Sequence, residues 1–117
     1  VTLPHGIGMA IGGFYPHISH GQALAIVYPE FVKFTAPSAP RAFNLLIEHL
    51  SPSSTTPIHA INTFLESIGL NKSLSDFDVS KDDLPKLTAQ CMVLPDYQAN
   101  PRVATPDEMQ MLVSAIY

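Results

Sequence analysis

The sequence predicts an all-α protein, a bundle of about five or six helices. Apolar residues recur three and four positions apart along most of the chain, and no segment alternates in the manner of a strand. Eleven prolines stand mostly where this periodicity begins or ends. The length of 117 residues suits one domain with a single core, so we expect one helical domain over residues 1–117.

The first predicted element, residues 5–14, is rich in glycine. It contains four glycines in ten residues, and each weakens a helix by up to about 1 kcal/mol relative to alanine. A helix here therefore needs tight packing, and small residues permit close approach by another backbone or a ligand. Because this segment breaks a local rule without an obvious structural gain, it is a candidate for function.

The second element, residues 21–34, is predicted to be the central buried helix. Apolar side chains surround almost its whole circumference: Ala23, Leu24, Ile26, Val27, Phe31 and Phe34. Pro29 lies inside this helix and should kink it, because proline cannot donate the backbone hydrogen bond at its position.

Two amphipathic helices are predicted next, over residues 39–50 and 57–68. The first carries Phe43, Leu46, Ile47 and Leu50 on one side. The second has Thr56 as its N-cap, Pro57 at its first position and Gly69 just beyond its end. Its expected buried stripe consists of Ile61, Phe64, Leu65 and Ile68.

A further helix is predicted over residues 81–94. It follows Ser80, and we expect Asp83 to complete a capping box with that serine. Pro85 should tighten or kink the first turns.

The last helix is predicted over residues 106–117 and has the clearest start. Thr105 is its N-cap, Pro106 is its first residue, and Glu108 stands at the third helical position and completes a capping box. Its inner face consists of Met109, Leu112, Val113 and Ile116.

Composition and charge argue against two classes of function. The six lysine and arginine residues are scattered and the net charge is −4, so no basic patch for nucleic acid emerges. The longest strongly apolar stretch, Ala23–Tyr28, is far shorter than the roughly 18 residues that a membrane span requires.

A single cysteine, Cys91, excludes an internal disulfide and fits a reducing cytosol. We therefore expect a cytoplasmic protein with a buried, inert thiol.

The chain has features of a piece of a longer protein. It opens with Val1, and no basic segment followed by an apolar run marks a signal peptide. Only 14% of its residues are charged, which leaves apolar surface for a partner or a missing domain. We therefore expect further domains outside these residues.

Two of the five histidines, His5 and His20, are candidates for metal binding. Each precedes a glycine, each begins a predicted helix, and together they flank the glycine-rich segment. Two neutral imidazoles placed in this way can converge on one divalent metal, although a catalytic site normally has at least three protein ligands. The residues alone leave two interpretations open: a shared metal, or histidines that cap and pack helix ends.

Two other motifs do not support a function. The acidic residues Asp76, Asp78, Asp82 and Asp83 lack the glycine and the terminal glutamate of a calcium-binding EF-hand loop, which favours a solvated loop. The Gly-x-Gly of residues 6–8 follows no predicted strand, so it does not indicate a dinucleotide-binding fingerprint.

Three stretches of the chain resemble the C-terminal half of iron-containing (group III) alcohol dehydrogenases. They are His5-Gly6 followed by Gly13-Phe14-Tyr15, the run from His20 to Pro29, and Asn100-Pro101-Arg102 before the last helix. The resemblance covers essentially the whole chain in order. It implies the fold of that family's C-terminal domain, an α domain of the dehydroquinate synthase-like type.

The resemblance also implies a metal centre that this chain completes only in part. The family holds Fe²⁺ or Zn²⁺ with one aspartate and three histidines, of which the last two match His5 and His20. The other two ligands, and the domain that binds NAD or NADP, would precede Val1. The implied activity is that of an alcohol dehydrogenase or aldehyde reductase, in which the metal polarises the substrate during hydride transfer. The chain alone should be inactive.

The same resemblance suggests Met9, Phe14 and Tyr15 as residues that line the substrate pocket. It assigns no catalytic acid or base to this chain. The implied partners are a small alcohol or aldehyde and the missing N-terminal domain, and the resemblance is compatible with a homo-oligomer.

Two positions depart from the family pattern. Many members carry a second histidine one helical turn after the first, where this chain has Met9, which cannot relay a proton. The interval from His5 to His20 is one residue longer than usual, and residues 16–19 absorb the insertion. His17 is a candidate for a compensating polar role, against the simpler interpretation of a surface-loop histidine.

A stand-alone helical interaction module is the alternative hypothesis. In that case His5 and His20 only cap helices. The two hypotheses differ in what precedes Val1, because a glycine-rich nucleotide-binding region with an Asp-x-x-x-His pair would support the dehydrogenase.

Overall fold

The computed structural model describes all 117 residues and contains only helices, with no strand. Six are α-helices: α1 (Leu3–Phe14), α2 (His20–Thr35), α3 (Pro40–Leu50), α4 (Pro57–Ser67), α5 (Leu84–Val93) and α6 (Pro106–Ala115). Four are short 3₁₀ helices: η1 (Ala36–Ser38), η2 (Leu74–Phe77), η3 (Lys81–Asp83) and η4 (Pro95–Ala99). The predicted all-α class and number of helices are confirmed.

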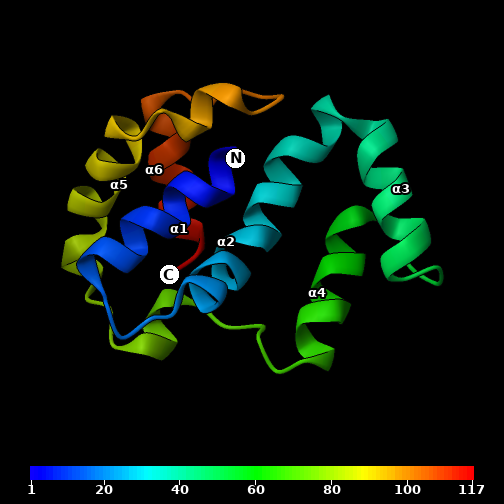
Figure 1. Ribbon diagram of the computed structural model, residues 1–117, viewed down its shortest axis with the longest axis horizontal. Coiled ribbons are helices and arrows are strands. Elements are labelled where there is room, and N and C mark those ends of the chain that lie inside the picture. Colours follow the sequence, from blue (N-terminus) through cyan, green and yellow to red (C-terminus); the bar gives the residue numbers. More distant parts are fainter.

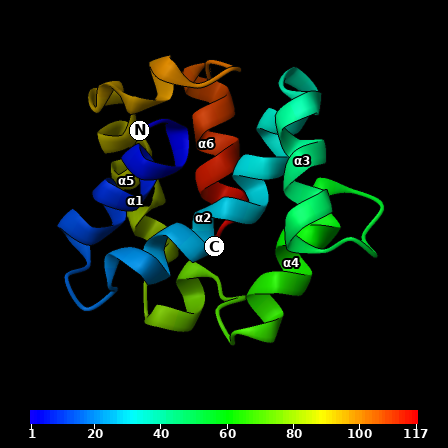
Figure 2. The ribbon, with the colours of Figure 1, turned by 45° about the vertical axis from the view of Figure 1, so that its right-hand side comes forward.

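Helix α2 runs through the middle of the molecule, with α1, α5 and α6 on one side and α3 and α4 on the other (Figure 1). The larger hydrophobic cluster, of 18 buried residues, lies on the α1, α5 and α6 side. A smaller cluster joins α2 to α3 and α4 and consists of Ala25, Val32, Phe43, Ile61 and Leu65. The turned view shows α3 and α4 as a separate pair beside α2 (Figure 2). The expected single core is therefore divided into two clusters that share α2.

The glycine-rich segment forms helix α1 because the apolar face of the helix is fully buried. Leu3, Ile7 and Ile11 repeat at four-residue intervals and are at most 2% exposed. On two other sides of the helix, the buried Gly6 lets η4 approach the helix backbone and the buried Gly8 lets α2 approach it. This close approach is the packing that the glycines predicted.

Helix α2 begins one residue earlier than predicted, at His20. Ser19 and Gln22 form a reciprocal capping box that the sequence interpretation did not include: the Gln22 backbone N–H donates to the Ser19 hydroxyl, and Gln22 Oε1 accepts from the Ser19 N–H. Pro29 lies inside the helix, as predicted, and its neighbours Val27 and Val32 are 1% exposed. The capping box fixes the first residue of α2 and therefore the position of His20.

The predicted caps of α4 and α6 are confirmed. Thr56 accepts from the backbone N–H of His59, and Gly69 follows α4 with a φ of +72°. Thr105 and Glu108 form the complete capping box at the start of α6. The four predicted inner-face residues of α6 are buried.

Two expectations about the other helices are wrong. Phe64 and Ile68 were placed on the buried stripe of α4, but they are 39% and 49% exposed, because the small second cluster contacts only the face that carries Ile61 and Leu65. The capping box between Ser80 and Asp83 does not form. Its segment starts as η3, and the carboxylate of Asp83 instead accepts a hydrogen bond from a tyrosine of another element.

No helix in this fold combines the length and the apolar character that crossing a membrane would need.

Candidate functional site

His5 and His20 come from the first turns of α1 and α2 and lie side by side. Their ring centroids are 5.4 Å apart, with an interplanar angle of 78°. Helix α2 passes α1 at Gly8, where an added Cβ would lie 3.1 Å from Leu24 Cδ2 and 3.6 Å from His20 Cε1. The absence of a side chain at Gly8 therefore lets Leu24 of α2 pack closely against α1, next to His20.

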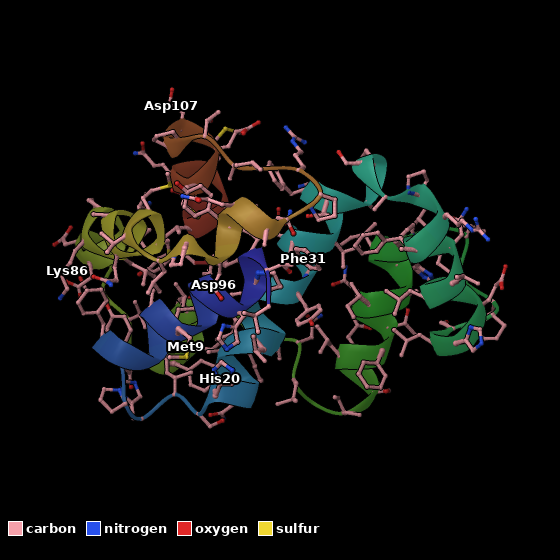
Figure 3. All side chains as sticks on the ribbon, turned by 45° about the horizontal axis from the view of Figure 1, so that its top comes forward. Met9, His20, Phe31, Lys86, Asp96 and Asp107 are labelled. Atoms are coloured by element: carbon pink, nitrogen blue, oxygen red, sulfur yellow. The ribbon has the colours of Figure 1, made fainter.

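The separation of the two rings fits a shared metal ion. Two imidazoles that bind one tetrahedral metal, each through a nitrogen at about 2.1 Å, have ring centres roughly 5 Å apart. His5 is 35% exposed and His20 is exposed, so both rings reach the surface. His20 and Met9 project from the same part of the molecule, near Asp96 (Figure 3).

Asp96 is a third member of this cluster, and the sequence interpretation missed it. His5 Nδ1 donates a hydrogen bond of 2.9 Å to Asp96 Oδ1, across 91 positions of sequence. The carboxylate side chain is 15% exposed. In the sequence, Asp96 is recognisable only as an acidic residue shortly before the Asn-Pro-Arg stretch. That position does not by itself indicate contact with His5.

The Asn-Pro-Arg stretch holds η4, and hence Asp96, against the end of α2. Asn100 is 5% exposed, and its Nδ2 donates to Thr35 Oγ1 at 2.9 Å and to the carbonyl of Arg102 at 2.8 Å. The guanidinium of Arg102 lies 4.0 Å from the centre of the Phe34 ring and donates to Glu108. Through these contacts the Asn-Pro-Arg stretch joins η4 to the end of α2 and the start of α6.

Glu108 is held as an anion at the start of α6. The backbone N–H of Thr105, then the Arg102 guanidinium, keeps the pKa of its carboxyl below the usual range. The carboxylate therefore links the capping box of α6 to the Asn-Pro-Arg stretch.

The three residues suggested for the pocket have different surroundings. Met9 is 50% exposed and lies one helical turn after His5, on the same face of α1. Phe14 packs under the ammonium of Lys86, which lies 4.4 Å from its ring centre. The Tyr15 hydroxyl donates to Asp83 Oδ2 at 2.7 Å. Their contacts with a substrate remain a prediction.

Tyr15 is kept as a neutral phenol by its surroundings. Partial burial, the hydrogen bond to Asp83 and the negative charge of that carboxylate raise the pKa of Tyr15 to about 12. The contact joins the end of α1 to η3, which explains why Asp83 does not cap its own helix.

The remaining histidines lie outside the cluster. His17 Nε2 donates to the carbonyl of Phe77 at 2.9 Å, which ties the loop before α2 to η2. His49 bonds to the Leu45 carbonyl within α3, and His59 contacts Ser54 at the start of α4. Within residues 1–117 no three histidine, cysteine, aspartate or glutamate side chains are grouped so that they could hold a metal ion.

The fold is a helical domain that carries the paired imidazoles of His5 and His20 at its surface. The family model of the "Fe-containing alcohol dehydrogenase family, C-terminal" matches residues 1–117. The chain therefore belongs to the iron-containing alcohol dehydrogenase family, as its C-terminal domain.

Two enzymes are similar to this chain in sequence at low identity. A long-chain primary alcohol dehydrogenase of Thermoanaerobacter ethanolicus is 24% identical over 122 residues, covering 98% of this chain and 31% of that protein. The lactaldehyde reductase of Escherichia coli K12 is 26% identical over 116 residues, covering 92% of this chain and 30% of that protein. The chain thus spans about a third of the length of these relatives.

Solved structures match the whole fold. An archaeal halo-thermophilic alcohol dehydrogenase from a Red Sea brine pool superposes with a TM-score of 0.89 at 22% identity, covering 100% of this chain and 33% of that chain. At this identity the likeness establishes the fold.

Proposed function

We propose that this chain is the C-terminal domain of a metal-dependent, NAD(P)-linked alcohol dehydrogenase or aldehyde reductase, to which it contributes the ligands His5 and His20. The observation that carries the proposal is the pair of imidazoles 5.4 Å apart on the surface of a domain of this family. The relatives are named as a long-chain primary alcohol dehydrogenase and a lactaldehyde reductase, which supports the same class of reaction.

The donor set fits Fe²⁺ or Zn²⁺. Imidazole nitrogen is a good ligand for both metals, and two such ligands leave room for the further protein ligands that a catalytic site needs. We assign those further ligands, and the domain that binds NAD or NADP, to residues that precede Val1. When bound, the metal supplies a Lewis acid that polarises the carbonyl of a small aldehyde or ketone.

Each residue of this chain has a limited role in that chemistry. His5 and His20 hold and orient the metal, each as a neutral imidazole with a free ring nitrogen. Met9 borders the substrate and excludes water, but its thioether cannot carry a proton. Phe14 and Tyr15 form the more distant wall of the pocket. We place the enzyme in the reducing cytosol, where Cys91 stays a thiol.

The test compares the full-length protein that carries this chain with its His5→Ala and His20→Ala variants. His49→Ala is the matched control, because His49 is exposed and bonds only within α3. Metal content is measured by plasma mass spectrometry, and alcohol oxidation by the appearance of NAD(P)H. Both site variants should lose most metal and activity, while the control keeps both.

Retained metal and full activity in both site variants would contradict the proposal. That result would favour the helical interaction module, in which the two histidines only cap helices.

A further inference from the structure

We propose that Asp96 is a positioning residue, which fixes the tautomer and the ring orientation of His5 so that Nε2 is the atom offered to the metal. This inference rests on the proposed function, because it concerns how one of its two metal ligands is prepared. The pair that carries it is the 2.9 Å hydrogen bond from His5 Nδ1 to Asp96 Oδ1.

The hydrogen bond determines where the imidazole proton is held. A carboxylate only accepts hydrogen bonds, whereas a neutral imidazole has one nitrogen that donates and one that accepts. The proton of His5 must therefore lie on Nδ1, and the lone pair must lie on Nε2. A carboxylate behind a metal-binding histidine also increases the basicity of the ligating nitrogen.

Asp96 lies behind the ligand and is not a ligand itself. It contacts Nδ1, and Nε2 is on a different side of the five-membered ring. A metal at Nε2 would therefore lie away from the carboxylate. This agrees with the absence of any group of three candidate ligands in the chain.

Three features of the fold hold Asp96 in place. Its backbone belongs to η4, which packs along α1. Gly6 leaves so little space that a Cβ there would lie 2.9 Å from the Cβ of Asp96. The buried amide of Asn100 anchors the far end of η4 to Thr35. A carboxylate fixed in this way, and only 15% exposed, can hold one orientation of the His5 ring.

The experiment uses the full-length protein with Asp96→Ala and Asp96→Asn. Asp82→Asn is the matched control, because Asp82 is exposed and its side chain makes no hydrogen bond. Zn²⁺ affinity is measured by competition with a chelator. The tautomer of His5 is read from the ¹⁵N shifts of its ring in the metal-free protein, and circular dichroism verifies that each variant is folded.

We expect Asp96→Ala to weaken Zn²⁺ binding about 10- to 100-fold and to release His5 from the Nδ1–H tautomer. Asp96→Asn keeps a neutral acceptor, so both effects should be smaller. Asp82→Asn should match the unchanged protein.

Two outcomes separate this inference from the function on which it rests. If His20→Ala removes the metal but a folded Asp96→Ala binds Zn²⁺ as tightly as the unchanged protein, the role of Asp96 is refuted and the metal site stands. If His5→Ala and His20→Ala leave Zn²⁺ binding unaltered, the metal site itself is refuted and the role of Asp96 is refuted with it.

Discussion

Gly6 of α1 and Asp96 of η4 are packed so closely that a Cβ on Gly6 would lie 2.9 Å from the Cβ of Asp96. The atom in the way is next to the backbone of η4, so it cannot move aside as the end of a long side chain could. The packing of Asp96, 90 positions away, therefore requires a glycine at position 6. Replacing Gly6 should displace the carboxylate that bonds to His5.

We predict that Gly6→Ala lowers the free energy of unfolding by about 1–2 kcal/mol, because the strain of overpacking exceeds the gain in helix propensity. Gly12→Ala is the matched control, since nothing lies within 4 Å of the Cβ it would add. The control should raise stability by up to about 1 kcal/mol. Urea denaturation followed by circular dichroism measures both, and equal stabilities would contradict the prediction.

The buried amide of Asn100 provides the second prediction. Asn100→Ala removes hydrogen bonds to Thr35 and to the carbonyl of Arg102, and should cost about 1–2 kcal/mol of stability. The cost is moderate because Asn100 Oδ1 is buried without a partner, and the substitution removes that group too. Asn71→Ala, at an exposed position, should change thermal stability much less. Equal effects at both positions would show that the amide does not anchor η4.

Tyr15 should make stability fall at high pH. The pKa of its hydroxyl is raised to about 12 in the folded chain, against 10.0 for an ordinary tyrosine. The unfolded chain therefore loses this proton first, so the contribution of Tyr15 is complete below pH 10 and is lost as pH rises toward 12. Denaturation at a series of pH values should show that the unchanged protein loses stability more steeply in this window than the Tyr15→Phe variant does. Tyr117→Phe is the control, and an identical pH profile for Tyr15→Phe and the unchanged protein would refute this.

Cys91 should not react with thiol reagents while the domain is folded. Its side chain is 2% exposed, and burial raises the pKa of the thiol to about 12, so almost no thiolate is present at neutral pH. Labelling is followed by mass spectrometry of the peptide that contains Cys91, with and without urea. The labelling rate should follow the fraction of unfolded protein. Rapid labelling under native conditions would contradict the buried position.

The helix ends were predictable because their signals are local. Thr105 and Glu108 exchange their two hydrogen bonds three positions apart, and Pro106 follows Thr105, so the capping box of α6 can be identified from spacing. Thr56 and Gly69 bound α4 for the same reason. The Ser80–Asp83 box met the same spacing rule but failed, because Tyr15 offers Asp83 a different hydrogen bond.

The site was predictable only in part. The positions of His5 and His20 made them candidates and the family resemblance implied that they are metal ligands, and the folded chain places their rings near each other. Asp96 could not be found in this way, because its partner lies 91 positions earlier and no spacing rule connects them. The roles of Met9, Phe14 and Tyr15 remain predictions.

The amino-acid sequence alone determined the helical class, the positions of the best-capped helices and the two histidines at the heads of α1 and α2. These depend on periodicity and on hydrogen bonds between near neighbours. Tertiary packing decided which helix faces are buried, which partner Asp83 takes and which carboxylate stands behind His5. Those outcomes depend on how α1, α2 and η4 approach one another in space, and close approach at Gly6 and Gly8 joins groups that lie far apart along the chain.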